Sequence, residues 1–251
     1  AIILDPISSD DYIPITRISG IPEYERLSLL HSLNLRAKAR KAAAKLNVDF
    51  KDVNMIGCHL GGGISMAAFE KGKAIDANHG LLGYGPFSPQ RAGTLAISVI
   101  MDLCYSGKYT LKELSNKLGK SSGLMGYLGT DDARVVTERI AKGDEKAKLV
   151  FEAMALQIAK ELGAMAAVLS GDVACVFITG GLANSTMLVD WIVERVKFLA
   201  PVFVLPGEDE IEAMAEGAMR VLTGTEEPRE YTSEDSLKSR LERPNDFKLF
   251  K

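Results

Sequence analysis

Three short stretches of this 251-residue chain combine residue types that are suited to binding phosphate. The first is the run His59–Gly63, of sequence HLGGG, in which a predicted buried strand over 53–58 meets three glycines before a second predicted strand over 64–69. Because glycine has no Cβ atom, consecutive glycines let backbone N–H groups approach a polyphosphate closely. The alternative is a plain hairpin turn between two strands, since glycine-rich turns are common.

The second stretch covers residues 177–185, of sequence FITGGLANS, where a predicted strand over 173–179 runs into Gly180 and Gly181. A predicted helix over 185–199 follows directly. A ligand here would meet the carboxyl end of a strand and the N-terminus of a helix, which is the usual ligand crevice in α/β folds. A simple strand–helix turn is the alternative. Two such glycine turns in one chain favour phosphate binding at both.

The third stretch is the loop over 85–94, of sequence GPFSPQRAGT, which presents Arg91 shortly before a predicted helix over 92–105. Its two prolines stiffen the backbone. A planar guanidinium on a stiff loop is suited to holding a carboxylate or a phosphoryl group in transfer. The alternative is an ordinary solvated surface arginine.

Other polar residues could join such a site. His31 lies among leucines in a predicted helix over 23–46, either as a core histidine or as a catalytic group. Asp5 follows a predicted strand over 1–5 and is either a turn residue or a functional carboxylate. Four acidic side chains begin a predicted helix over 208–222, where they either interact favourably with the helix dipole or hold hydrated magnesium.

The alternation of strands and helices along the whole chain predicts an α/β fold with a mixed sheet. The remaining expected elements are strands at 74–77 and 201–205, a loop at 78–92, helices at 111–118 and 145–169, and a helix that starts from Thr130 or Asp131 and ends at 141.

Composition narrows the classes of function. The net charge is −3 with a pI near 5.8, which disfavours a nucleic-acid partner. No apolar stretch is long enough to span a membrane, and the first residues do not have the pattern of a signal peptide. Three cysteines, Cys58, Cys104 and Cys175, lie in apolar runs. We expect them to be buried, reduced thiols of a cytoplasmic protein.

The ordered runs HLGGGIS, GPFSPQRAGTL and ITGGLANS closely resemble the butyrate kinase branch of the acetate/butyrate kinase family. Asp5-Pro6 and the stretch 30–34 fit the same pattern, so that the resemblance extends from residue 1 to about residue 224. It implies an actin-like ATPase (ribonuclease H-like) lobe with a mixed sheet and flanking helices. It also implies an inter-lobe remnant over 1–50, a C-terminal nucleotide-binding lobe over 51–224 and a polar appendage over 225–251.

The reaction that the resemblance implies is reversible transfer of the γ-phosphoryl group of ATP to a short-chain carboxylate, butyrate or a branched-chain acid, which gives ADP and an acyl phosphate. A carboxylate is already ionised at pH 7, so no strong base is needed. Two anions must approach each other in line, and Mg²⁺, a guanidinium, an imidazole and backbone donors would offset their repulsion.

The resemblance also assigns roles to individual residues. Catalysis would involve Arg91, His31 and Asp5. The second phosphate loop would be formed by His59, Gly61, Gly62 and Gly63, and the adenosine turn by Gly180, Gly181 and Asn184. The base or ribose would be lined by Asp132 and Arg134, and the metal would be held by Asp5 and Glu210.

Two departures from the family pattern shape the remaining expectations. Acetate kinases usually carry Asn where this chain has Gly62, which favours the butyrate branch. A first phosphate loop of the type N-P-G-S-T-S-x-K is not found in the sequence, so we expect the N-terminal lobe, roughly a third of the family's length, to be mostly absent. A truncated sequence, a separate polypeptide that supplies this lobe, and a degraded relative would each account for this.

We therefore expect little or no kinase turnover from this chain alone. The alternative function is that of a nucleotide-binding subunit or fragment without catalysis. A sugar-kinase or chaperone-like relative is disfavoured, because the Arg91 loop resembles only the acyl kinases. By the same resemblance, the chain is expected to form a homo-oligomer.

Overall fold

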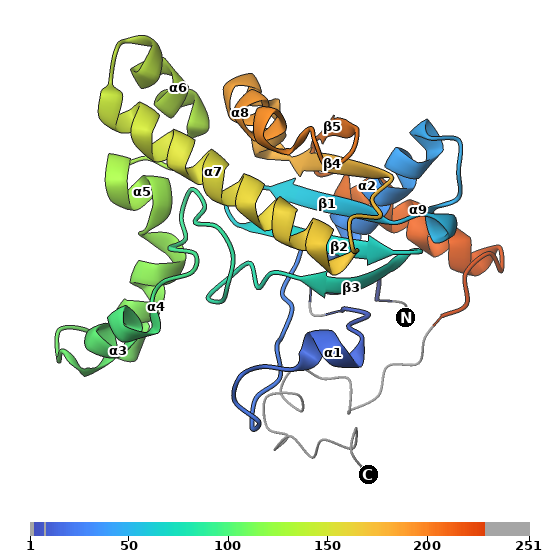
Figure 1. Cartoon of the computed structure of the whole chain (residues 1–251), viewed down its shortest axis with the longest axis horizontal. Helices are drawn as coiled ribbons and strands as arrows, with labels where there is room; N and C mark the ends of the chain where they lie inside the picture. The colour runs from blue at the N-terminus through green and yellow to red at the C-terminus, as the bar shows by residue number, and fades with distance from the viewer. Residues whose placement is uncertain (1–2, 8, 229–251) are drawn as a thin grey trace.

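The centre of the structure is a five-stranded mixed sheet with the strand order β3-β2-β1-β4-β5 (Figure 1). The computed structural model describes residues 3–7 and 9–228, and all statements on the fold refer to these. The strands are β1 (Met55–Leu60), β2 (Ile64–Glu70), β3 (Lys73–Ala77), β4 (Cys175–Gly180) and β5 (Val202–Pro206). β1, β4 and β5 are mutually parallel, whereas β2 is antiparallel to both β1 and β3. The carboxyl ends of three strands therefore meet at one edge, and the predicted mixed α/β fold is confirmed.

Helices cover both faces of this sheet. The helices of the described residues are α1 (Pro14–Arg17), α2 (Ser32–Lys45), α3 (Ile97–Tyr105), α4 (Leu111–Lys120), α5 (Gly123–Leu128), α6 (Ala133–Ala141), α7 (Glu145–Val168), α8 (Thr186–Val196) and α9 (Glu210–Leu222), with short 3₁₀ helices η1 (Phe50–Asp52) and η2 (Gly181–Asn184). α7 and α8 pack on one face, and α2, with α9 against it, packs on the other (Figure 1).

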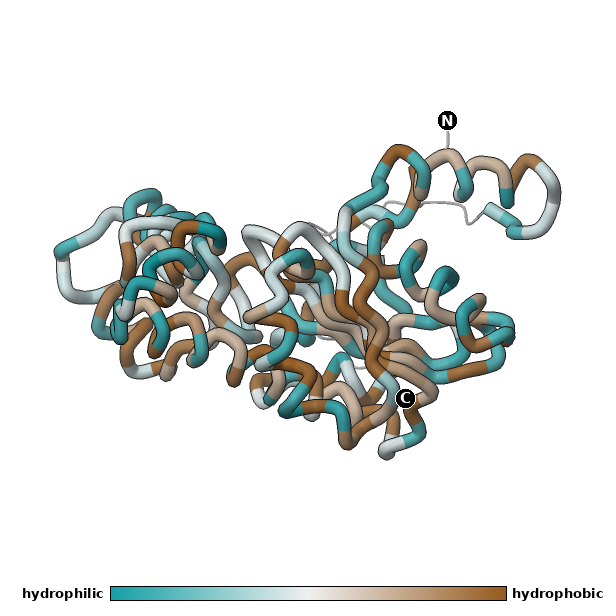
Figure 2. The backbone as a smooth tube through the Cα atoms, turned by 90° about the horizontal axis from the view of Figure 1, so that it is seen from above, coloured by the Kyte–Doolittle hydropathy of each residue, from teal (hydrophilic) through white to brown (hydrophobic). Residues whose placement is uncertain are grey.

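The strands alternate between two hydrophobic cores because successive side chains of a strand point to opposite faces. In β1, Ile56, Cys58 and Leu60 join the core under α7, whereas Met55 joins the core under α2. Figure 2 shows the hydrophobic residues concentrated in these central strands. By the same alternation, His59 faces α2 and is a polar residue in an otherwise apolar row.

Residues 23–31 do not form the first turns of a helix, as the leucine spacing had predicted. α2 begins only at Ser32, and the preceding residues run extended, with isolated bridges from Glu25 to Ile18 and from Leu29 to His79. Ser28 is buried and donates to the Asp10 carboxylate over 2.7 Å. Tertiary hydrogen bonds thus override a local helical pattern here.

Other predictions were wrong in detail. Residues 3–5 form no strand, and residues 1 and 2 lie outside the described residues. α5 forms between the predicted helices over 111–118 and 130–141, where no helix was predicted. The N-cap of α6 is Asp132, one residue after the expected start. Cys104 is exposed, whereas Cys58 and Cys175 are buried as expected.

The predicted C-terminal appendage lies almost entirely outside the described residues, which end at 228. No helix in the described part of the chain is both long and apolar enough to cross a membrane.

Candidate functional site

The glycine run lies at the sheet edge where the parallel strands end. Gly61, Gly62 and Gly63 connect β1 to β2, and the Gly61 N–H donates to the carbonyl of Gly63 over 3.0 Å. The buried Ser88 hydroxyl donates to the carbonyl of Gly62 over 2.7 Å. The run is therefore a tight turn, as the hairpin alternative required, and the Arg91 loop lies directly against it.

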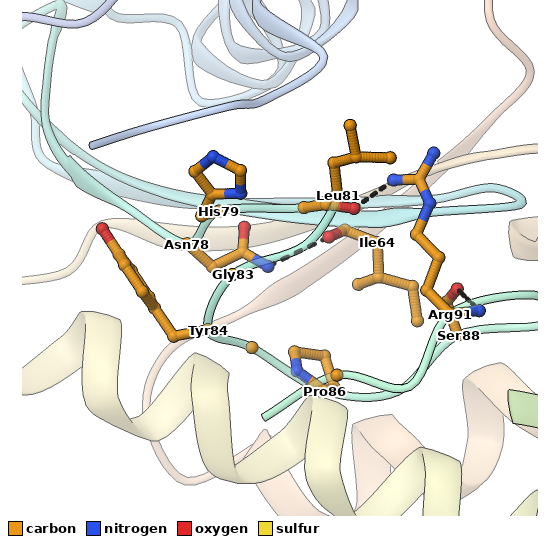
Figure 3. A pocket seen from close by; sticks show the side chains of 12 residues that line it. Ile64, Asn78, His79, Leu81, Gly83, Tyr84, Pro86, Ser88 and Arg91 are labelled. Carbon is orange, nitrogen blue, oxygen red and sulfur yellow. Dashed lines mark hydrogen bonds between the residues drawn. The ribbon is translucent and has the colours of Figure 1, made fainter. Parts of the chain in front are cut away.

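Arg91 approaches the turn so closely that a side chain on Gly63 would have to displace its guanidinium. A Cβ atom built on Gly63 would lie 1.9 Å from Nη1 of Arg91. The same Nη1 donates to the carbonyl of Gly80, and the Arg91 N–H donates to Ser88 Oγ over 3.2 Å (Figure 3). Nε of Arg91 is buried and has no hydrogen-bond partner among the described residues. The structure thus brings together two of the three predicted stretches.

A small pocket lies beside Arg91, and Figure 3 shows the residues that line it. Its walls combine Ile64, Tyr84 and Pro86 with the polar side chains of His79 and Arg91. Burial, followed by the Arg91 charge, lowers the pKa of His79, and its Nδ1 is a buried atom without a partner in the described structure. A cation beside partly apolar walls suits a small anion that has an apolar part.

His31 lies at the N-cap of α2 and stacks on His59. The two ring centroids are 3.9 Å apart with an interplanar angle of 16°, and Nδ1 of His31 is 2.8 Å from Ser65 Oγ. Burial and the charge of Arg91 lower the pKa of His31. Burial, His31 and Lys38 together lower the pKa of His59 to about 3. Both rings are therefore neutral at pH 7.

The second glycine turn meets the first at the end of β1. Gly180 has a φ angle of +89°, and a Cβ atom there would lie 2.4 Å from the carbonyl oxygen of Leu60. Only glycine fits both this conformation and this approach. Gly180 also exchanges two backbone hydrogen bonds with Gly207, of 3.3 and 3.2 Å. Since Leu60 directly precedes Gly61, the two predicted phosphate turns are neighbours.

Two residues of the short helix after Gly180 face outward. Gly181 and Asn184 are exposed in η2, and the Asn184 amide donates to the carbonyl of Gly181 over 3.0 Å. A Cβ atom built on Gly181 would meet no neighbour within 4 Å. This turn has the open surface that an adenosine group would need, next to glycines that suit its phosphates.

Asp132 and Arg134 bind each other at the start of α6. Asp132 caps the helix by accepting from the Arg134 N–H over 2.9 Å, and the two side chains form an ion pair of 2.6 Å. Hydrogen bonds from Arg134 lower the pKa of Asp132 to about 2. The Arg134 side chain is 88% exposed. A 2.6 Å bond between Gln90 and Asp131 links this segment to the Arg91 loop.

The two predicted metal carboxylates are not brought together. Asp5 is paired with Arg36 over 3.2 Å, and burial, partly opposed by Arg36, raises the pKa of Asp5. Glu210 is exposed in the first turn of α9, and its neighbour Asp209 pairs with Lys38 over 2.7 Å. The described residues contain no group of three or more His, Cys, Asp or Glu side chains that could hold a metal ion. These residues alone do not fit a magnesium site.

Four polar residues of the site were missed at the sequence level. Ser88 and Gln90 stand in the same loop as Arg91, and Ser65 interrupts the apolar face of β2 opposite His59. Their positions were visible as polar residues inside stiff or apolar stretches, which is a weak signal. Asn34 binds His59, and nothing in its local sequence indicates that contact.

Comparison with known proteins gives one family and several solved structures. The sequence model of the Acetokinase family matches residues 30–212, which is more than half of the chain. Acetate kinase from Porphyromonas gingivalis is 22% identical, with a TM-score of 0.75. A propionate kinase from Francisella tularensis is 23% identical with a TM-score of 0.73, and acetate kinase from Entamoeba histolytica is 20% identical with a TM-score of 0.72.

Each of these three comparisons covers 83% of this chain. The share of the solved protein is smaller, 61% for the first two and 63% for the third. At such low identity the likeness establishes the fold, and it confirms the expected actin-like lobe with a mixed sheet and flanking helices. The chain therefore spans about three-fifths of the length of the solved structures that it matches.

Proposed function

Since the chain belongs to the acetokinase family, we propose that it forms the larger part of a carboxylate kinase, which transfers the γ-phosphoryl group of ATP to a short-chain carboxylate. A carboxylate oxygen forms a bond to phosphorus, the bond between phosphorus and the ADP oxygen breaks, and an acyl phosphate and ADP result. The observation that carries this proposal is the placement of the Arg91 guanidinium against the Gly61–Gly63 turn.

The residues of this chain would act by binding and orientation. The glycine turn offers backbone N–H groups to phosphate oxygens. Arg91 has an unpartnered buried Nε and faces the pocket, so its guanidinium suits the carboxylate and the phosphoryl group between the two substrates. His31 is neutral and adjacent, and can donate a hydrogen bond without adding a second cation. No general base is required, because the acceptor is already ionised.

The proposal also names the metal, Mg²⁺, and the length of the acyl chain. When bound with the nucleotide, Mg²⁺ would neutralise phosphate charge. Asp5 and Glu210 stay the proposed carboxylates near it, although they are apart in this structure. We propose butyrate or a branched-chain acid as the acceptor, because Gly62 replaces the Asn of acetate kinases and the pocket has partly apolar walls. Comparing acyl phosphate formation from acetate, propionate, butyrate and isobutyrate tests this choice.

A nucleotide-binding subunit without catalysis is the second candidate. It is supported by the separation of Asp5, which pairs with Arg36, from Glu210, which is exposed at the start of α9. In this case ADP would bind at the Gly61–Gly63 and Gly180 turns, but no phosphoryl group would be transferred.

Arg91→Ala distinguishes the two candidates. In a carboxylate kinase this change should lower the transfer rate at least about 100-fold, because a donor to the developing charge is lost, and should change the ADP affinity less than about threefold. Arg195→Ala is the matched control, since Arg195 pairs with Glu152 on the surface of α8. Acyl phosphate formation and ADP calorimetry give the two readouts. Equal and measurable transfer by wild type and Arg91→Ala would contradict the proposal.

We also propose that the chain forms a homo-oligomer in a cytoplasmic setting, without nucleic acid or a membrane as partner. In α3 no side chain is buried, and Ile97, Met101 and Tyr105 are 79%, 55% and 87% exposed. Apolar exposure of this kind is typical of an interaction surface. Sedimentation at several concentrations, with Ile97→Asp as the variant, tests whether copies of the chain associate there.

A further inference from the structure

Asn34 has a hydrogen-bond arrangement that fixes which way its amide points. Its Nδ2 lies 2.5 Å from the carbonyl oxygen of Glu208 and 3.4 Å from that of Gly207. Carbonyl oxygens only accept hydrogen bonds, so the amide nitrogen must face them. A flipped amide would place three acceptors together. Oδ1 of Asn34 therefore faces the Nδ1 atom of His59, at 2.8 Å.

This orientation determines the tautomer of His59. Oδ1 is an acceptor, so Nδ1 of the imidazole must carry the proton. A neutral ring then has a bare Nε2. That atom lies on the side of the glycine turn, 3.1 Å from the position that a Cβ atom on Gly61 would take. Both His59 and Asn34 are almost completely buried, at 2% and 3% exposure, so water does not compete for this bond.

The charges around the ring support the neutral form. His31 stacks on one face, Lys38 of the same helix is nearby, and Arg91 approaches from the loop beyond His31. A proton on Nε2 would add a positive charge close to that of Lys38. Lys38 is itself engaged by Asp209 and the carbonyl of Pro206, at 2.7 and 2.9 Å. The cation that remains for an anionic ligand is then Arg91.

Asn34 also links the two glycine turns. Its Nδ2 holds the Gly207–Glu208 backbone, and Gly207 exchanges backbone hydrogen bonds with Gly180. Its Oδ1 holds the ring that lies beside Gly61. We infer that Asn34 is a positioning residue of the nucleotide site, which holds His59 as the Nδ1–H tautomer and keeps the Gly61–Gly63 and Gly180 turns in register.

This tautomer has a chemical consequence. A bare Nε2 cannot donate to a phosphate oxygen, so His59 does not bind phosphate directly. It can accept from a glycine N–H or from a water molecule that the nucleotide brings. Asn34 and His59 therefore act through the shape of the turn, and this part of the inference rests on the proposed function. The tautomer itself does not.

The test reads the ring nitrogens directly. The chain contains three histidines, so ¹⁵N-labelled His31→Gln and His79→Gln variants assign the ring signals of the intact protein. At pH 7 we expect His59 to show a protonated Nδ1 and a bare Nε2. In Asn34→Ala we expect part of the population to move to the Nε2–H form. A wild-type spectrum with a bare Nδ1, or an Asn34→Ala spectrum without change, would overturn the inference.

Affinity for ADP supplies the second readout. Asn34→Ala should weaken it about fivefold, the value of one ordinary hydrogen bond. Asn54→Ala is the matched control, because that amide bonds Asp172 and the Lys71 N–H outside the site. In Asn34→Asp the carboxylate still accepts from Nδ1, so the tautomer should return, but the lost donors to Gly207 and Glu208 should leave the affinity low. Equal affinity of wild type and Asn34→Ala would contradict the positioning role.

Failure of the proposed function is a separate outcome. If the wild-type chain binds no ADP, the kinase proposal is wrong, whereas the ring spectra still decide whether Asn34 sets the tautomer of His59. If Asn34→Ala does not fold, the wild-type spectrum alone decides this, since it either shows the protonated Nδ1 or does not.

Discussion

Arg91 lies against Gly63 where the loop meets the glycine turn, and this pair defines the site at the scale of single residues. A Cβ atom on Gly63 would meet the flexible end of the Arg91 side chain, whereas a Cβ atom on Gly180 would meet the backbone of Leu60. An added methyl group would therefore have different effects at these two positions. At Gly63 it would move a functional group, and at Gly180 it would strain the fold.

Gly180→Ala should destabilise the protein by roughly 2 kcal/mol or more, because the left-handed conformation and a backbone clash both oppose the new side chain. Gly181→Ala is the control, since nothing lies within 4 Å of its Cβ position, and should change the free energy of unfolding by less than about 0.5 kcal/mol. Denaturant titration measures both. Similar stabilities of the two variants would show that the β1–β4 contact is not as close as described.

Gly63→Ala should leave stability within about 1 kcal/mol of the wild type, because the guanidinium can move away. It should nevertheless mimic Arg91→Ala by lowering the affinity for acyl phosphate. Calorimetry with acyl phosphate and with ADP checks this expectation. Retained affinity for acyl phosphate would mean that Arg91 does not need its present position.

His59 predicts a pH dependence of stability. The pKa of its ring is about 6.5 in the unfolded chain, and burial, His31 and Lys38 lower it to about 3 in the folded protein. Between these values the unfolded state binds more protons, so stability is present above pH 6.5 and is lost as the pH falls. The slope for one such group is at most about 1.4 kcal/mol per pH unit. Unfolding at pH 7.0, 6.0 and 5.5 should show a shallower slope for His59→Gln, and an unchanged slope would contradict the assigned burial.

At the scale of elements, the contacts of Arg26 with Asp76 and Tyr84 hold the segment before α2. Its guanidinium contacts both carboxylate oxygens of Asp76, at 3.1 and 3.0 Å, and lies over the ring of Tyr84 at 5.0 Å. Asp76 is 5% exposed. Tyr84 also lines the pocket beside Arg91, so the contacts of Arg26 connect the N-terminal segment to the wall of the site.

Arg26→Met should lower the free energy of unfolding by about 2 kcal/mol or more, because it leaves the Asp76 carboxylate buried without its ion-pair partner, while solvent partly screens the Arg26 charge. The double variant Arg26→Met/Asp76→Asn should be less destabilised than the sum of the single variants. A double-mutant cycle by thermal or denaturant unfolding measures the difference. Additive effects would show that the pair contributes little.

The sequence predicted the strands and long helices well, because their periodicity is a local property. It predicted β1, α7 and the Gly180 turn to within a few residues. It failed over residues 23–31, where the leucine spacing is helical but the backbone follows contacts to β3 and the loop after it. Those contacts, like the Asn34–His59 bond, join residues that are distant in the chain, and a single sequence carries no signal for them.

The candidate site residues also divide into those that local sequence predicts and those that depend on contacts between distant parts of the chain. The glycine turns and Arg91 were found because glycine and proline mark backbone geometry directly. Their mutual proximity required the strand order, which places β1 next to β4. The separate positions of Asp5 and Glu210 could not be foreseen, since both depend on how α2 and α9 pack.

At the scale of the whole molecule, the chain should bind ADP but turn over little substrate by itself. The glycine turns and Arg91 are assembled, whereas Asp5 pairs with Arg36 and lies apart from Glu210. Acyl phosphate formation by the purified 251-residue chain, with ADP calorimetry in parallel, tests this expectation. Robust turnover would contradict it, and absence of ADP binding would contradict both candidate functions.

Arg91 and Gly63 are held in place by different elements of the fold. Gly63 ends the β1–β2 turn, whereas the backbone around Arg91 is bonded to α5 by the Met125 N–H to Pro89 and the Ser122 N–H to Gln90. α5 in turn packs on α7, a helix of 24 residues that is therefore about 36 Å long. The position of Arg91 relative to Gly63 therefore depends on how the Arg91 loop and α5 pack on α7, and a misplacement of about 1 Å can cost 100-fold in rate.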